Sequence, residues 1–398
     1  MASAAEDAIV IVGTARTAMG SFQGSLASMT APQLGSAAIK GAIERAGVKP
    51  DEVSEVLMGC VLPAGIGQAP ARQASIFAGI PNTVPCTTVN KMCGSGMKTV
   101  MQAYDALHAR PSDVIVAGGM ESMTNAPYLL PKMRGGARLG HAEVKDHMFL
   151  DGLEDAFDKG RLMGTYAEDT AQHYQFTREA QDAFATESLK RAKRANEDGS
   201  FTKEMVKVSV KGKGGAVEVT QDEQPFTADL TKISKLKPAF REGGTVTAAN
   251  SSSISDGAAA LVLMRASEAK RRNLHPLARI TGVAGVAQAP AWFTTAPIGA
   301  MKKVLEQVGW NTRDVGLYEI NEAFAVVAMA AMRDLALPHE KVNVHGGACA
   351  LGHPVGASGA RIIITLLHAM EKYGQDKGVA SLCIGGGEAT AVAVERLV

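Results

Sequence analysis

The sequence predicts an α/β fold made of two copies of one unit, with a loop-rich subdomain inserted between them. The first observation is an internal repeat of a helix, a closing glycine and an apolar strand, at 43–59 and again at 305–321. The second is the alternation of apolar strands with amphipathic helices within each copy. The third is a change of composition between the copies, where this alternation weakens and glycine and charged residues become frequent.

The composition is that of an ordinary globular chain, long enough for two or three domains. It has 398 residues, of which 46% are hydrophobic and 20% charged, and a net charge of +1. This charge balance predicts no nucleic-acid partner, and no apolar run approaches the roughly 18 residues of a membrane span. The five cysteines have no paired spacing, and the acidic start is unlike a signal or transit peptide. We therefore expect reduced thiols and a cytoplasmic location.

The first copy contains a strand-to-helix elbow. An extended run at 87–89 leads into the segment NKMCGSG at 90–96, and an apolar-periodic helix follows from Met97. A thiol at a helix N-terminus meets unpaired backbone N–H groups and the positive end of the helix dipole, which lower its pKa. Cys93 is therefore a candidate nucleophile. The alternative is a small buried cysteine, because free Cys is among the most buried residue types.

Short motifs occur in the same order in both copies. SGMK at 95–98 matches SGAR at 358–361, and GGME at 118–121 matches GGGE at 385–388. We predict a first half at 1–123, completed by 250–273, and a second half at 274–398. The segment 124–249 between them is predicted to be a loop domain with one clear helix, from the cap Thr177 to Ala195. It lies where an element that covers a substrate would lie.

The second copy carries a histidine where the first carries the elbow cysteine. His353 lies in a glycine-dense loop just ahead of a helix predicted at 361–373, and these glycines let backbone and substrate approach closely. His353 is thus either a catalytic group or a satisfied structural histidine. His345, Cys349 and His353 are also metal-ligating types, but a glycine loop does not hold helical i, i+4 geometry. No metal site is predicted.

A second cysteine stands at the end of a late strand. Cys383 is followed directly by the glycine turn Gly385–Gly387. Backbone N–H groups in such a turn can bind a developing oxyanion. The sequence therefore places a thiol beside a candidate anion-binding turn.

Four of these stretches, in their order along the chain, resemble the four signatures of the thiolase family. They are NKMCGSG at 90–96, NEAF at 321–324, GHP at 352–354 with GASG at 356–359, and CIGGG at 383–387. The resemblance spans essentially the whole chain. It implies a five-layer α/β/α/β/α core of two mixed-sheet halves plus the loop domain. It also implies an assembly as a dimer or a tetramer. We expect a homotetramer, a dimer of dimers, and would look for its tetramer contacts at 123–140.

The resemblance also implies a reaction, that of an acetyl-CoA C-acetyltransferase. Two acetyl-CoA condense reversibly to acetoacetyl-CoA and CoA, or acetoacetyl-CoA is cleaved by thiolysis. Cys93, activated by His353, would become acetylated, and Cys383 would move the proton of the second substrate. Asn321 would hold a water that stabilises the enolate together with His353. The N–H groups of Cys93 and Gly385 would form the oxyanion hole.

The expected lining of the CoA channel comes from the same resemblance. CoA thioesters are substrates, and no cofactor is expected. Phe293 stands where a methionine is common at the acyl pocket and Leu162 where a histidine is common, which leaves the preferred acyl length open. Lys232, Lys235 and Lys237 are interpreted either as phosphate contacts or as a solvated basic face. The channel residues are expected to be Leu153, Met163, Phe240, Ala248, Ser252, Phe293, Ala323 and Phe324.

Other interpretations remain. A 3-ketoacyl-CoA thiolase of fatty-acid β-oxidation would use the same groups on longer chains, and a catalytically silent protein would only bind acyl-CoA. The joint presence of Cys93, Asn321, His353 and Cys383 argues against the silent protein. A condensing enzyme that uses acyl carrier protein would want a second histidine in place of Asn321. This asparagine is interpreted alternatively as the polar cap of a helix predicted at 322–335.

Overall fold

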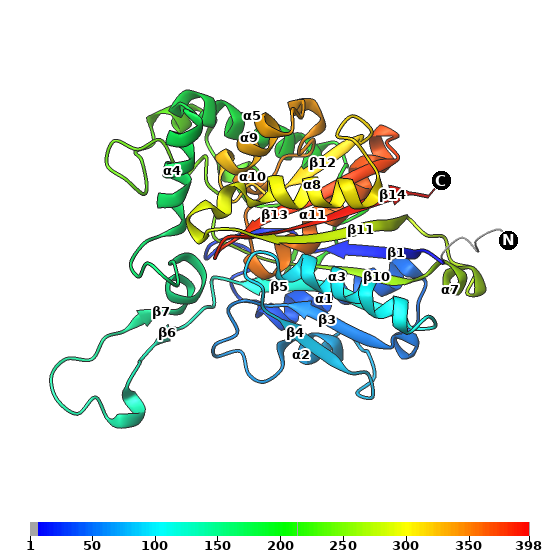
Figure 1. Cartoon of the computed structure of the whole chain (residues 1–398). Coiled ribbons are helices and arrows are strands. Elements are labelled where there is room, and N and C mark those ends of the chain that lie inside the picture. Colours follow the sequence, from blue (N-terminus) through cyan, green and yellow to red (C-terminus); the bar gives the residue numbers. More distant parts are fainter. Residues whose placement is uncertain (1–6, 213, 398) are drawn as a thin grey trace.

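Two groups of strands, one from each half of the chain, lie side by side in the core (Figure 1). This computed structural model describes residues 7–212 and 214–397. Parallel pairs (β3 with β4 and β5, β12 with β13) occur beside antiparallel ones, so both groups are mixed sheets. In sheet order the first group is β1 (Ile9–Arg16), β10 (Ser255–Arg265), β5 (Ile115–Ser122), β3 (Glu55–Gly59) and β4 (Cys86–Val89), with β2 (Gly20–Ser21) on β10; the second is β11 (Ala278–Ala287), β14 (Glu388–Arg396), β13 (Lys377–Ile384) and β12 (Leu317–Ile320).

The two groups have equivalent strand orders, which confirms the internal repeat. The first strands of the two halves, β1 and β11, meet at the centre, where Val10 pairs with Arg279 and Ile11 with Ala278. Outward from this junction, the last strand of each half comes next (β10 or β14). It is followed by β5 or β13, and then by β3 or β12. The inserted segment connects β5 to β10 at the place where the second half has only the short turn between β13 and β14.

Helices form three layers around the two groups of strands. Helices α3 (Ser95–Ala109) and α11 (Val355–Tyr373) lie between them and share one hydrophobic cluster with strands of both. Helices α1 (Ala31–Ala46) and α2 (Pro70–Phe77) cover the outer face of the first group, and α8 (Ala296–Val308) and α9 (Ala325–Asp334) that of the second. The predicted α/β/α/β/α architecture is confirmed.

The close contact of the two central helices requires glycine at two equivalent positions. A Cβ on Gly96 would lie 2.9 Å from the backbone nitrogen of Ala360, and a Cβ on Gly359 would lie 2.4 Å from that of Met97. Gly96 is the second residue of α3 and Gly359 the fifth of α11, so the N-terminal ends of both helices are held together. We predicted α11 to begin at Arg361. It begins at Val355, because the small residues that look like a loop form the turn that packs on α3.

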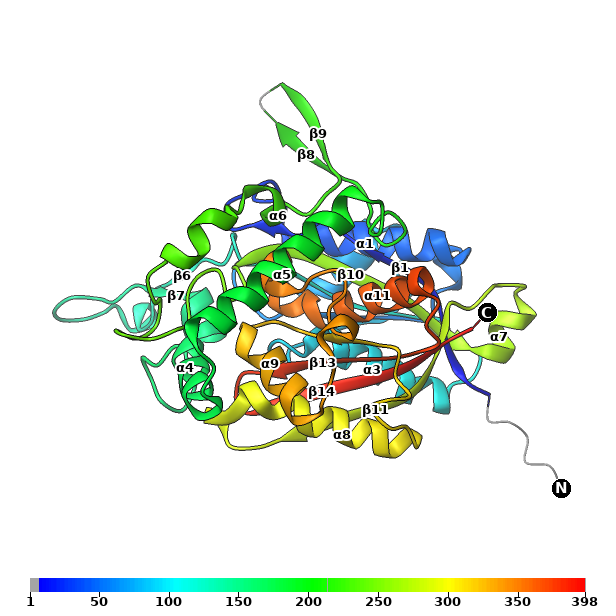
Figure 2. The ribbon, with the colours of Figure 1, turned by 90° about the horizontal axis from the view of Figure 1, so that it is seen from above.

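The inserted segment lies on one side of the core and sends two hairpins outward (Figures 1 and 2). The predicted helix is present as α5 (Arg178–Glu197), with the Thr177 hydroxyl capping Ala180 N–H. A second helix, α4 (Met163–Tyr174), went unpredicted because its N-cap residue Leu162 makes no side-chain cap bond. The division at 1–123, 124–249, 250–273 and 274–398 stays a prediction.

The remaining elements are short. No helix of the described residues is both long and apolar enough to cross a membrane. These elements are β6 (Tyr128–Leu129), β7 (Lys145–Asp146), β8 (Val208–Gly212), β9 (Gly215–Val219), α6 (Gln224–Thr227), α7 (Ala266–Arg271), α10 (Ala348–Leu351), the π-helical η3 (Phe149–Leu153), and the 3₁₀ turns η1 (Pro50–Glu52), η2 (Met133–Gly135), η4 (Leu230–Lys235), η5 (Pro290–Thr295) and η6 (His339–Lys341).

Candidate active site

Cys93 lies on a tightly fixed loop between β4 and α3. Met92 adopts a left-handed conformation (φ 47°), which is unusual for a non-glycine residue, and its N–H donates to Asn90 Oδ1 at 3.0 Å. The Ser95 hydroxyl donates to Met92 O at 2.6 Å and accepts from Lys91 N–H at 2.9 Å. The loop therefore projects the Cys93 side chain from a rigid backbone at the start of α3.

Burial dominates the acidity of the Cys93 thiol. It raises the pKa to about 11, although the backbone N–H groups of Gly385 and Cys93 itself contact the sulfur and act in the opposite direction. The expectation of a lowered pKa at the helix N-terminus was therefore wrong in sign. A thiol with this pKa needs a base that removes its proton during the reaction. The two N–H groups also meet at the sulfur from opposite halves of the chain.

His353 has a ring nitrogen that is free to accept a proton. Its Nδ1 lies 2.6 Å from Ser358 Oγ, and this hydroxyl donates its hydrogen to Pro354 O at 3.0 Å. Ser358 must then accept from Nδ1–H, which leaves the lone pair on Nε2. Nε2 is buried and has no hydrogen-bond partner among the described residues. Burial, with the charge of Arg361 second, lowers the pKa of His353 to about 3, so the imidazole stays neutral.

Asn321 contributes a second unpaired polar group. It is fully buried, and its side-chain oxygen and nitrogen have no hydrogen-bond partner in the described part of the chain. The interpretation as a helix cap is wrong, because α9 begins at Ala325 and its N-cap residue is Phe324. A buried amide without a partner costs roughly 1–3 kcal/mol. Such a group is retained where it hydrogen-bonds a bound molecule.

Cys383 lies at the end of β13, close enough to Cys93 for their charges to interact. It is fully buried, and burial, then the charge of Cys93, raises its pKa well above the ordinary value. The turn that follows has φ +94° at Gly386 and +92° at Gly387, a conformation that glycine adopts without strain. This turn presents Gly385 N–H to the Cys93 sulfur.

The expected channel residues lie in three places. Met163, Phe240, Phe293, Ala323 and Phe324 belong to the outer cluster of the second half, with Ser252 bonded to Ala323, whereas Leu153 and Ala248 each lie elsewhere. Phe240 packs edge-on against Phe324 at 5.9 Å between ring centroids, and Met163 lies beside Gly385. Leu153 belongs to the small cluster that also contains Cys93. Phe293 is buried and packs edge-on against Tyr166, with 6.2 Å between ring centroids. Ser252 N–H donates to Ala323 O. Ala248 lines a separate cavity of about 290 Å³ together with Lys232.

Glu121 lies close enough to Cys93 for its charge to act on the thiol, and the sequence analysis did not propose it for the site. Its fully buried carboxylate accepts hydrogen bonds from the backbone N–H groups of Val61, Leu62 and Gly356, at 2.9 to 3.1 Å. Burial raises its pKa to about 7 in spite of these donors. The carboxylate ties the loop after β3 to the first turn of α11, which follows His353 in the chain. Its signal was present as the acidic residue of GGME, which we used only as a repeat marker.

The three residues considered for a metal do not form a cluster. Within residues 7–212 and 214–397, no group of three or more His, Cys, Asp and Glu side chains is arranged to hold an ion. His345 instead packs edge-on against Phe201, and Cys349 Sγ donates to Glu322 O.

Two family models cover nearly the whole chain. The model of the thiolase N-terminal domain matches residues 9–267, and that of the thiolase C-terminal domain matches residues 274–396. The chain therefore belongs to the thiolase family.

Similar proteins within the family are named acetyl-CoA acetyltransferase. Acetyl-CoA acetyltransferase 2 of Arabidopsis thaliana is 52% identical over 393 residues, 98% of this chain and 97% of the relative. Acetyl-CoA acetyltransferase of Cupriavidus necator is 50% identical over 390 residues, 98% of this chain and 99% of the relative. The crystal structure of Acat5 thiolase from Ascaris suum in complex with coenzyme A has a TM-score of 0.93 at 41% identity. That match covers 98% of this chain and all of the other.

The two pKa shifts predict that Cys93 and His353 are both neutral in the resting enzyme. We expect alkylation of Cys93 by iodoacetamide in the free enzyme to accelerate from about pH 8 to about pH 10, without a plateau near neutrality. Mass spectrometry of the peptide that contains Cys93 gives the rate at each pH. A plateau already reached at about pH 7 would contradict the prediction, because it would indicate a thiolate paired with an imidazolium.

Proposed function

We propose that this protein is an acetyl-CoA C-acetyltransferase that works through an acetyl-Cys93 intermediate. The observation that carries the proposal is that the Cys93 sulfur is contacted by Gly385 N–H and lies close enough to Cys383 for their charges to interact. His353 and Asn321 belong to the same proposal, because both bury a polar atom that has no partner in the described residues. The names of the relatives at about half identity support the same reaction.

The first step is the transfer of an acetyl group to the nucleophile. His353 Nε2 takes the proton of Cys93, and the sulfur attacks the carbonyl carbon of the acetyl thioester. The N–H groups of Cys93 and Gly385 stabilise the oxyanion, a contribution worth roughly 10²–10³ in rate for each such donor. The tetrahedral intermediate collapses, and the leaving CoA sulfur takes the proton from His353.

Cleavage of acetoacetyl-CoA uses Cys383 as the acid. Cys93 attacks the β-keto carbon, the C–C bond breaks, and the electron pair passes to the enolate of acetyl-CoA. The raised pKa keeps Cys383 in the thiol form, which protonates this carbanion. Asn321, through a water, and His353 stabilise the enolate oxygen. CoA then attacks acetyl-Cys93, its thiol proton restores Cys383, and the leaving Cys93 sulfur takes back the proton that His353 had removed.

The test is the rate of thiolysis against acyl length, from acetoacetyl-CoA to 3-ketohexadecanoyl-CoA. We expect kcat/KM for the four-carbon substrate to be at least about tenfold higher, because Phe293 is held by Tyr166 at the expected acyl pocket. Activity that holds or rises with length would instead assign a 3-ketoacyl-CoA thiolase. Binding of CoA without cleavage of any substrate would assign the silent acyl-CoA-binding protein.

CoA thioesters are the only small molecules in this proposal, and no cofactor takes part. The cavity lined by Ala248 and Lys232 is the proposed place for the nucleotide end of CoA, where the lysine would face a phosphate. A cytoplasmic location belongs to the proposal, supported by the absence of disulfides in the described residues. Mouse relatives named mitochondrial and cytosolic are both 48% identical to this chain.

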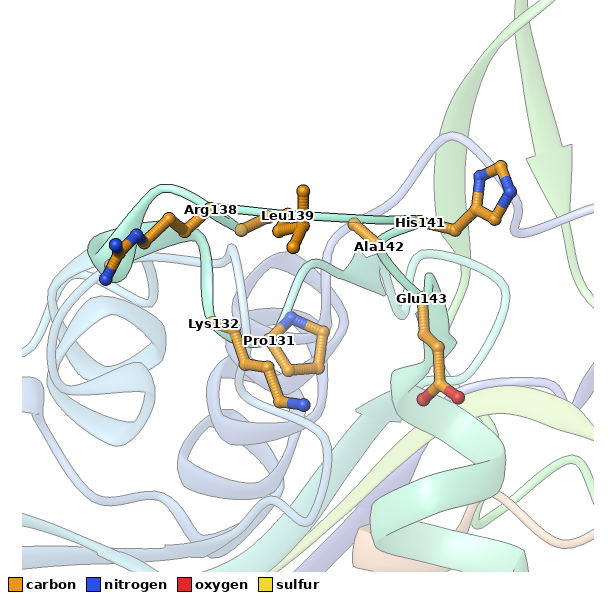
Figure 3. Close-up of a pocket in the computed structure, with 9 residues that line it drawn as sticks. Pro131, Lys132, Arg138, Leu139, His141, Ala142 and Glu143 are labelled. Carbon is orange, nitrogen blue, oxygen red and sulfur yellow. The ribbon is translucent and has the colours of Figure 1, made fainter.

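The proposed assembly is a homotetramer built from two dimers. The loop between β6 and β7 extends away from the core and exposes large apolar side chains, of which Leu139 is 97% exposed. Figure 3 shows that the concavity beside these residues is lined by the loop itself. An exposed apolar loop of this kind is explained by burial against other subunits. The edge strand β4, with exposed Ile76 and Phe77 nearby, suits the dimer contact.

Replacement of Leu139 by aspartate is expected to convert tetramers to dimers, because it places a charge in the proposed contact. Light scattering after gel filtration gives the mass. Val217→Asp on the other hairpin, where the valine is 52% exposed, is the matched control and should stay tetrameric. A Leu139→Asp variant that stays tetrameric would show that the tetramer contact lies elsewhere.

A further inference from the structure

The Cys93 loop and the glycine turn after β13 come from opposite halves of the chain and pack directly on one another. A Cβ on Gly94 would lie 2.4 Å from Ile384 Cδ1. One oxyanion-hole donor, Cys93 N–H, belongs to the loop and the other, Gly385 N–H, belongs to the turn. Because the two donors have no covalent connection nearby, contacts between the loop and the turn must fix their relative position.

Polar side chains bridge the two segments beside this contact. Lys91, two residues before Cys93, forms an ion pair through Nζ with Glu388 Oε2, three residues after Gly385. These partners are 297 residues apart in sequence. The backbone of Lys91 is held by Ser95 Oγ, so the lysine extends from the rigid part of the Cys93 loop.

The position of Glu388 follows from its strand register. It pairs with Ile384 on β13 and with Ala287 on β11, so its backbone is fixed on both sides. Side chains alternate along β14: Val392 and Val394 join the central cluster, whereas Ala389, Ala391 and Ala393 join the outer one. Glu388 shares the parity of the central set and therefore faces the layer that contains α3.

We propose that the Lys91–Glu388 ion pair positions the two N–H groups of the oxyanion hole against each other. Both residues are positioning residues, since neither contacts the reacting sulfur. The inference rests on the proposed function, because it concerns the same acetyl transfer. The side chains are 27% and 40% exposed, and ion pairs with this exposure contribute little to stability. Their effect should therefore appear in the rate rather than in the melting temperature.

The experiment compares Lys91→Gln, Glu388→Gln and the double variant. Acetoacetyl-CoA turnover by the wild-type enzyme first establishes the proposed function. We then expect each single variant to lower kcat about tenfold, with KM for CoA and Tm nearly unchanged, because displaced donors stabilise the oxyanion poorly. The double variant should lose no more than either single variant, since all three lack the same contact.

A matched control lies on the same strand. Glu395 also forms an ion pair from β14, with Arg279, and its exposure is similar, but it lies far from the turn. Glu395→Gln should keep wild-type kcat. High salt should lower the kcat of the wild-type enzyme toward that of Glu388→Gln. The kcat of Glu388→Gln itself should not change with salt. Single variants with wild-type kcat, a loss of kcat that follows Tm, or additive losses in the double variant would each overturn the proposal.

Discussion

Replacement of Cys93 by alanine is expected to remove both acetyl transfer and thiolysis, with kcat lowered by at least roughly 10⁴-fold. Alanine removes the only proposed nucleophile, and the oxyanion hole and His353 cannot form the covalent intermediate alone. The fold should survive, because the residue as a whole is partly exposed and the substitution removes only its sulfur atom.

The decisive measurement follows the release of CoA from acetyl-CoA together with the mass of the protein. Wild-type enzyme should gain one acetyl group on the peptide that contains Cys93, and Cys93→Ala should gain none. Cys86→Ala is the matched control, since this half-buried cysteine lies on β4 a few residues away, and it should keep full activity. Acetylation of the Cys93→Ala protein at another thiol would reject the assignment of the nucleophile.

Replacement of Cys383 by alanine should separate the two half-reactions. We expect acetylation of Cys93 by acetyl-CoA to continue at nearly the wild-type rate, because His353 and both oxyanion donors remain. Cleavage of acetoacetyl-CoA should fall by about 10³-fold or more, since no group then protonates the leaving carbanion.

Single-turnover mixing with acetyl-CoA and steady-state thiolysis of acetoacetyl-CoA measure the two half-reactions separately. Exchange of deuterium from solvent into the methyl group of acetyl-CoA gives a third readout, which Cys383→Ala should lose. Equal losses of acetylation and cleavage would contradict the proposed division and would assign Cys383 to the structure of the site. Cys383→Ser should resemble alanine, because a hydroxyl is a much weaker acid than a thiol.

Local patterns predicted most of the fold. The cap Thr177 marks the start of α5, and the repeat around Gly47 and Gly309 marks two equivalent halves, because caps and periodicity act over a few residues. The same reasoning missed α4, which has no side-chain cap, and the first turn of α11, whose small residues are helical only because they pack on α3.

The sequence by itself determined the α/β class, the duplication and the identities of the catalytic candidates, since motif order and residue chemistry are local properties. Only the tertiary structure decided the protonation and the hydrogen bonding of these candidates. Burial raises the pKa of Cys93 and leaves Asn321 without a partner, and burial depends on every segment that packs around a group. The contacts of Glu121 with Gly356 and of Lys91 with Glu388 join residues more than two hundred positions apart, so no local pattern contains them.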